Sequence, residues 1–131
     1  MERPLSGIRA IGLEQYIAGP YCTMLLADAG AEIIKIERPL KGDPRRAMPP
    51  FAERQGVKKA AGFMGYNRNK KSFALNLRHS AGQKIFCELV AAADIVVENL
   101  RPGAMDKFGL NYGNLSSSHS RLIWALSLIH I

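Results

Sequence analysis

The chain has 131 residues, 47% of them hydrophobic, and a formal net charge of +7 at pH 7. This length suits one domain with a hydrophobic core, and the positive charge indicates an anionic partner without distinguishing nucleic acid, membrane and phosphorylated metabolites. The sequence contains no run of 18 or more apolar residues, the length that a membrane-spanning helix needs. The opening residues, MERPLSGIRA, lack the apolar stretch of a signal peptide. We therefore expect a cytoplasmic protein.

The first third of the chain predicts one strand–helix–strand unit. Residues Gly7–Glu14 are typical of a strand, and Pro20 suits the first turn of the helix that we expect over Tyr21–Ala29. Gly30 ends that helix, and Glu32–Glu37 (EIIKIE) predicts the second strand. Such a unit is typical of a parallel, doubly wound sheet.

The middle of the chain begins with a segment whose hydrophobic residues follow neither helical nor strand spacing. Residues Arg38–Gly65 are rich in proline and glycine, and we expect a long loop that is functional or mobile. Lys71–Leu77 predicts a strand, Ala81–Ala93 a helix with Ser80 as its N-cap, and Asp94–Leu100 a further strand.

The remaining residues predict a short helix over Pro102–Leu110, a solvated turn at Ser116–Ser120, and a strand beginning at Arg121. The fold class that we expect is α/β, a Rossmann-like parallel sheet with helices on both faces.

Basic residues follow three of the predicted strands. Arg38, Arg78 and Arg101 each come after a strand, and Lys107 follows in the next helix. Ligands of open α/β sheets bind outside the carboxyl ends of the strands, where a helix N-terminus also favours an anion. The guanidinium of arginine binds two phosphate oxygens at once, although scattered surface cations would give a similar pattern. With no GxGxxG or GxxxxGK[ST] motif, NAD is disfavoured and a P-loop is excluded, while a ligand with several phosphates and an adenine fits.

Two further features leave alternatives open. The cations of Asn67–Ser72 precede a strand and form either a second basic patch or one that the long loop folds over the first. Cys22, beside the predicted helix N-terminus, could have a lowered thiol pKa. Because no partner histidine is near, we favour two reduced, buried thiols at Cys22 and Cys87, and their spacing indicates no zinc or other metal site.

Four motifs in this order resemble the class III coenzyme A transferases: AGPYCTMLLADAGAEIIKIERP, GDPRR, NRNKKSFALNL and ADIVVENLRPGAMDKFGL. This family includes formyl-CoA and carnitine-CoA transferases and the 2-methylacyl-CoA racemases, and the resemblance runs from Gly7 to about Ser127. It implies coenzyme A and acyl-CoA as substrates, with no permanently bound cofactor, a carboxylic acid as partner substrate, and a homodimer of interlocked chains. It implies no nucleic acid or membrane partner.

The resemblance also implies which residues bind coenzyme A. Ile17 and Ala18 would contact it through their backbone, Arg38 would pair with a phosphate, and Lys107 stands where the family often has arginine. The segment at the end of the third predicted strand would line the adenine and ribose, and the segment at the end of the fourth would flank the pantetheine and diphosphate. These two segments comprise Leu75, Asn76, Leu77 and Arg78, and Asn99, Leu100 and Arg101.

Catalysis in this family proceeds through an aspartate that forms a mixed anhydride and then an enzyme–coenzyme A thioester. That aspartate, like the acid/base pair of the racemases, would follow a strand such as RLIWALS, so we assign no catalytic residue. We interpret residues 1–131 as the amino-terminal part of a larger domain, inactive by itself, and 128–131 as a candidate non-native tail. A racemase-like enzyme and a non-catalytic nucleotide-binding module are the alternatives, and a nucleic-acid protein ranks last.

Overall fold

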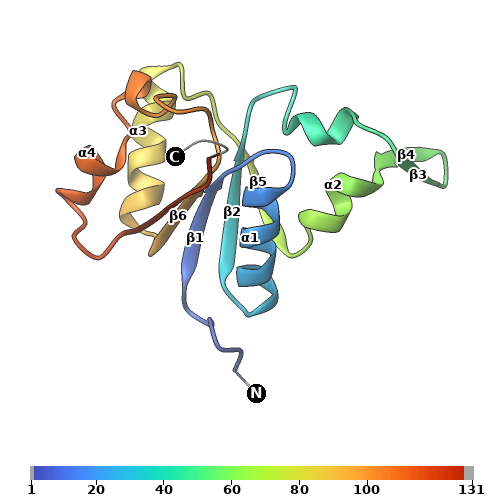
Figure 1. Ribbon diagram of the computed structural model, residues 1–131, viewed down its shortest axis with the longest axis horizontal. Helices are drawn as coiled ribbons and strands as arrows, with labels where there is room; N and C mark the ends of the chain where they lie inside the picture. Colours follow the sequence, from blue (N-terminus) through green and yellow to red (C-terminus); the bar gives the residue numbers. More distant parts are fainter. Residues whose placement is uncertain (1, 129–131) are drawn as a thin grey trace.

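A computed structural model describes residues 2–128 and shows a five-stranded, wholly parallel sheet (Figure 1). The strand order is β5-β2-β1-β6-β7. Their bounds are β1 Arg9–Leu13, β2 Glu32–Glu37, β5 Lys70–Ala74, β6 Ile95–Glu98 and β7 Ile123–Leu126. The predicted α/β class with a parallel sheet is confirmed.

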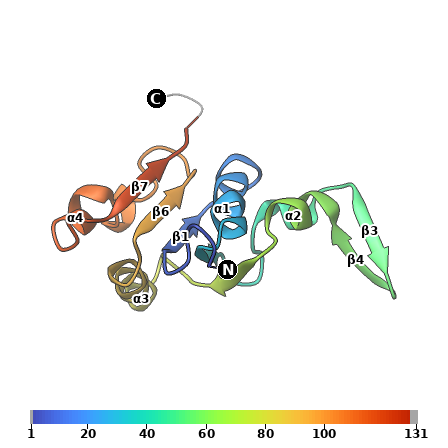
Figure 2. The same ribbon diagram turned by 90° about the horizontal axis from the view of Figure 1, so that it is seen from below.

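Two long helices, α1 (Ala18–Asp28) and α3 (Ser80–Ala91), cover opposite faces of the sheet (Figure 2). Side chains alternate along each strand, so neighbouring residues point to different faces. On the α3 side, Ile11 and Val96 pack with Phe86 in the main hydrophobic core. On the α1 side, Ala10 lies in a smaller cluster that also contains Ala27.

The segment Arg38–Gly65, predicted as a loop, is structured. It contains a 3₁₀ turn (Pro44–Ala47), a hairpin of β3 (Phe51–Arg54) and β4 (Val57–Ala60), and the start of α2 (Ala61–Tyr66). Gln55 and Gly56 have φ of 52° and 75°, which suits a two-residue hairpin turn. The prediction was wrong because nearly all hairpin side chains are exposed, so burial imposes no alternating pattern. Figures 1 and 2 show the hairpin extending away from the sheet.

Several predicted boundaries also differ from the structure. Helix α1 begins at Ala18, and His79 rather than Ser80 is the N-cap of α3. The helix predicted over Pro102–Leu110 is a turn followed by a 3₁₀ helix (Asp106–Phe108), which ends at the left-handed Gly109. The first residue of the turn predicted over Ser116–Ser120 is the last residue of a short helix, α4, which spans Tyr112–Ser116.

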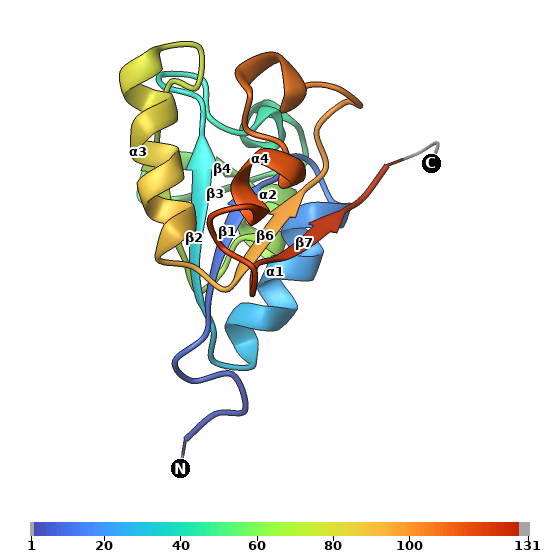
Figure 3. The same ribbon diagram turned by 90° about the vertical axis from the view of Figure 1, so that its left-hand side faces the viewer.

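Strand β7 lies at the edge of the sheet, beside β6 (Figure 3). Its Ile123 and Leu126 are 60% and 50% exposed. Of the candidate non-native tail, residues 129–131 lie outside the described residues. Within residues 2–128, no helix has both the length and the apolar character that a membrane crossing requires.

Candidate functional site

The parallel topology brings the predicted ligand-binding segments to one rim of the sheet. The segments that end in Arg78, Arg38 and Arg101 follow β5, β2 and β6, and the turn into α1 follows β1. Across the rim they lie in the order β5, β2, β1, β6. Adjacent strands are about 4.8 Å apart, so these segments span roughly 14 Å. The prediction that they share one rim is confirmed.

The cations at this rim have no acidic partner in the described chain. Arg38, Arg78, Arg101 and Lys107 are all exposed, and no salt bridge within residues 2–128 involves them. Their charges are therefore available to an anionic ligand.

The cations around the start of β5 are different. Arg68 pairs with Asp28 at 2.6 Å, Lys70 is buried against Glu14, and Lys71 pairs with Glu32. Because each of these cations is neutralised by a carboxylate, the hypothesis of a second basic patch over Asn67–Ser72 is wrong.

The N-terminus of α1 presents free backbone donors. Ile17 is its N-cap residue, without a side-chain cap, and the N–H groups of Ala18 and Gly19 form no hydrogen bond within residues 2–128. Gly19 is needed here, because a Cβ at that position would lie 2.7 Å from Cβ of Glu14 and 3.2 Å from the Asn99 side chain. Free N–H groups at a helix start favour an anion.

The turn between β1 and α1 is held from two sides. The Asn99 side chain accepts a hydrogen bond from the Gln15 backbone N–H and donates one to the Gln15 carbonyl, both at 2.8 Å. The Tyr16 backbone N–H donates to Oδ1 of Asp43 at 3.2 Å, and Tyr16 has a φ of 65°, in the left-handed region. Asn99, predicted to flank a ligand, thus uses its amide to position this turn.

The leucines among the predicted contacts belong to the core. Leu75 is 8% exposed and lies in the main cluster, and Leu77 and Leu100 pack partly buried against it. At the buried Leu75, a ligand contact would therefore be made through the backbone. Between the first two, the exposed Asn76 accepts a hydrogen bond from the Arg78 backbone N–H at 3.1 Å through its side chain.

Sequence reasoning missed a buried ionic cluster beneath the rim, which we call the ion network: Glu14, Lys35, Asp43 and Lys70. Nζ of Lys35 lies 2.8 Å from Oδ2 of Asp43, and Nζ of Lys70 lies 2.8 Å from Oε1 of Glu14. The Thr23 hydroxyl donates to the Glu14 carboxylate, which connects the network to α1. The one sequence signal is the lysine that interrupts EIIKIE, because a charged residue in a buried strand requires partners.

A second buried carboxylate lies beside the network. Glu37 accepts two 2.7 Å hydrogen bonds from Arg46, one from the Ser72 hydroxyl, and one from the Asp43 backbone N–H. Burial alone would raise the pKa of Glu37, but these hydrogen bonds lower it to about 2. Arg46 is thereby held close to the rim and is not available as a free cation.

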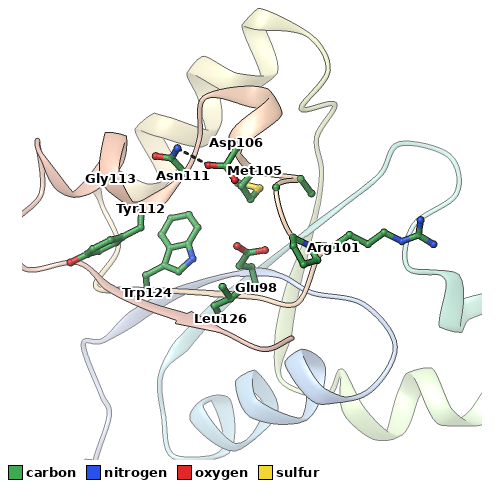
Figure 4. A pocket seen from close by; sticks show the side chains of 12 residues that line it. Glu98, Arg101, Met105, Asp106, Asn111, Tyr112, Gly113, Trp124 and Leu126 are labelled. Carbon is green, nitrogen blue, oxygen red and sulfur yellow. Dashed lines mark hydrogen bonds between the residues drawn. The ribbon is translucent and has the colours of Figure 1, made fainter. Parts of the chain in front are cut away.

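A pocket of about 400 Å³ opens beside the ends of β6 and β7 (Figure 4). Tyr112 and Trp124 line it, with ring centroids 6.3 Å apart, and Glu98 lies at its base. Burial raises the pKa of Glu98, and nearby Asp106 adds to the rise, although hydrogen bonds from the Leu100 backbone and Trp124 oppose it. In Figure 4 the Arg101 side chain points away from Trp124.

The thiols and metal ligands give no competing site. Burial, followed by the negative charge of Glu14, raises the pKa of Cys22, so the helix N-terminus does not activate it. Cys22 and Cys87 are partly buried free thiols. No group of three His, Cys, Asp or Glu side chains in the part of the chain described could hold a metal ion.

The chain matches the family model of CoA-transferase family III over residues 5–127. Curated relatives include the succinyl-CoA:mesaconate CoA-transferase of Haloarcula marismortui, 45% identical over 92% of this chain and 31% of that protein. The alpha subunit of succinyl-CoA–L-malate CoA-transferase of Chloroflexus aurantiacus is 42% identical over 92% and 28%. The chain therefore spans less than a third of the length of these relatives.

Solved structures show the same fold. The crystal structure of a CAIB/BAIF family protein from Brucella suis superposes with a TM-score of 0.88 at 38% identity, over 96% of this chain and 33% of that one. A hypothetical protein from Mycobacterium tuberculosis gives a TM-score of 0.86 at 36% identity, with the same coverage.

Proposed function

The chain belongs to CoA-transferase family III, and from this premise we propose that it forms the coenzyme A-binding part of an enzyme that transfers coenzyme A between an acyl-CoA and a carboxylic acid. The observation that carries the proposal is the rim with Arg38, Arg78, Arg101 and Lys107, none of which has an acidic partner within residues 2–128. Coenzyme A carries three phosphates and needs such cations.

Each element of the rim has a role in this proposal. The arginines bind the 3′-phosphate and the diphosphate, and Asn76 lies beside the adenine and ribose. The free N–H groups at the start of α1 bind a further anionic oxygen next to the backbone of Ile17 and Ala18. Lys107 supplies charge without the bidentate geometry of arginine.

We further propose a dicarboxylic acyl group. The two curated relatives described above carry names with succinyl-CoA as donor and mesaconate or L-malate as acceptor, and these acids are all dicarboxylic. In the whole protein, an aspartate beyond residue 131 would attack the thioester carbonyl and release the coenzyme A thiolate. The thiolate would then attack the resulting mixed anhydride, release the donor acid and form an aspartyl–coenzyme A thioester for the acceptor.

Two assays test the proposal. Coenzyme A should raise the melting temperature of the folded protein, because a ligand that binds only the native state stabilises it. A folded sample that shows no shift at millimolar coenzyme A would contradict the binding site. The whole protein should convert succinyl-CoA and a dicarboxylic acid into succinate and a new thioester, whereas residues 1–131 alone should show no turnover.

The assembly and location of the whole protein are separate proposals. We propose the homodimer of interlocked chains that the family resemblance implies, and a cytoplasmic location. The exposed hairpin of β3 and β4 supports the dimer, because its apolar side chains Phe51 and Val57 are 42% and 55% exposed and a second chain would cover them. Analytical ultracentrifugation of the whole protein should give the mass of two chains, and a monomer would contradict the dimer.

A further inference from the structure

We propose that Asp43 is a positioning residue for the coenzyme A-binding turn, which it holds through the backbone N–H of Tyr16. This inference rests on the proposed function and adds to it a residue outside the expected ligand contacts. Asp43 follows β2 and is 2% exposed, so it cannot itself serve as a surface contact for the cofactor.

One carboxylate links three separate segments. Oδ1 of Asp43 accepts hydrogen bonds from the backbone N–H groups of Tyr16 at 3.2 Å and Arg45 at 2.9 Å. Oδ2 accepts from Nζ of Lys35 at 2.8 Å, and Lys35 also donates to the Glu14 carbonyl at 3.2 Å. Asp43 and Lys35 therefore both bind the backbone of the β1–α1 turn, from below the rim.

The turn needs such support because its conformation is strained. Tyr16 has a φ of 65°, although it is not glycine, and a left-handed tyrosine persists only where its surroundings impose it. Two residues later the free N–H groups of Ala18 and Gly19 begin α1. If the Tyr16 backbone relaxed, these donors would change direction, and an oriented anion site would be lost.

The other side of the turn shows that Asp43 is not redundant. Asn99 binds both backbone groups of Gln15, the residue before Tyr16. Within residues 2–128, Asp43 is the hydrogen-bond partner of the Tyr16 N–H. Asn99 thus fixes the start of the turn, and Asp43 fixes the strained residue that leads into α1.

A matched pair of double variants tests the proposal. Lys35→Met/Asp43→Asn and Lys35→Met/Asp43→Ala each remove one positive and one negative buried charge, so both leave Glu14 paired with Lys70. They differ in the side-chain oxygen of residue 43, because asparagine keeps an acceptor for the backbone N–H groups of Tyr16 and Arg45 and alanine keeps neither. Lys35→Met/Asp43→Ser, whose hydroxyl keeps the contact to Arg45 alone, is therefore measured beside them to separate the two contacts. Glu32→Gln serves as control, since Glu32 pairs with Arg9 and Lys71 at the start of β2, at the opposite end of the strands from the rim.

The measurements are calorimetric titration with coenzyme A and hydrogen exchange of the Tyr16 amide. The alanine variant should bind coenzyme A about tenfold more weakly than the asparagine variant, as expected for loss of a hydrogen bond to a buried acceptor. Its Tyr16 amide should exchange about tenfold faster while amides of β1 keep their rates. The control should bind like the wild type.

Equal affinity and equal Tyr16 exchange in the two double variants would overturn the proposal. If the alanine variant does not fold, Lys35→Met/Asp43→Ser replaces it under the same criteria. Serine can still cap Arg45, but its hydroxyl ends one bond earlier and does not reach Tyr16. If the wild type binds no coenzyme A, the proposed function fails, and the exchange rates alone then support or overturn the role of Asp43.

Discussion

The two faces of the sheet differ in chemistry although the same strands build both. On the α3 face, side chains of β1, β2 and β6 join an apolar core around Phe86, and the one buried charged side chain that these strands place there is Glu98, at the end of β6. On the α1 face, the apolar cluster near Ile33 changes towards the rim into charged Lys35 and Glu37, both buried. Buried ion pairs stabilise a fold less well than apolar side chains of similar volume. The comparison therefore indicates that the α3 face supplies stability and the α1 face supplies geometry for the rim.

The largest expected effect is on the apolar face. Phe86 is fully buried, so Phe86→Ala should lower the free energy of unfolding by about 3–5 kcal/mol. Urea denaturation measures the change, and Leu25→Ala, at a position 50% exposed on α1, should change stability far less. The molecules of Phe86→Ala that remain folded should bind coenzyme A with the affinity of the wild type. Weaker binding would contradict the assignment of stability to the α3 face and of rim geometry to the α1 face.

The charged face should respond to charge balance. Lys35→Met leaves the carboxylates of Asp43 and Glu14 with only Lys70, and it should lower the free energy of unfolding by about 3 kcal/mol. Adding Asp43→Asn should recover part of that loss, because one buried negative charge is removed as well. If Lys35→Met had the same free energy of unfolding as the wild type in this denaturation series, the ion network would not carry the expected charges.

Acid should weaken the charged face first. The pKa of Glu37 is lowered from an ordinary value of 4.5 to about 2, so the folded state favours its ionised form. Its contribution, on the order of 3 kcal/mol, is complete above pH 4.5 and disappears as the pH falls towards 2. The stability difference between wild type and Glu37→Gln should shrink over that window, and a difference that stays constant would contradict the assigned pKa.

The rim should show the smallest effect on stability. Arg38→Ala, Arg78→Ala and Arg101→Ala remove exposed cations and should each change the free energy of unfolding by no more than about 0.5 kcal/mol. Each should nevertheless weaken coenzyme A binding about tenfold, the typical loss of a charged hydrogen bond. Lys84→Ala, which removes an exposed cation from α3, is the matched control and should bind normally.

The sequence predicted those parts of the fold where periodicity is strong. Strand Glu32–Glu37 has the predicted bounds, and the parallel topology that it implied placed Arg38, Arg78 and Arg101 at one rim. The hairpin around Gln55 was missed because its exposed side chains carry no hydrophobic pattern.

The support beneath the rim could not be predicted in the same way. Glu14 and Lys70 are 56 residues apart, and only the folded chain shows that they meet. Lys70 was therefore assigned to a basic patch, although it is buried against Glu14. Leu75, similarly, follows a strand as a ligand contact would, but its side chain completes the core.

Calorimetric titration of the wild-type protein with coenzyme A and with pantetheine, which lacks the nucleotide and its phosphates, would decide whether the rim is a phosphate site. Coenzyme A should bind at least about tenfold more tightly, because Arg38, Arg78 and Arg101 have no other anionic partner within residues 2–128. Equal affinities for the two ligands would mean that these arginines do not bind the phosphates.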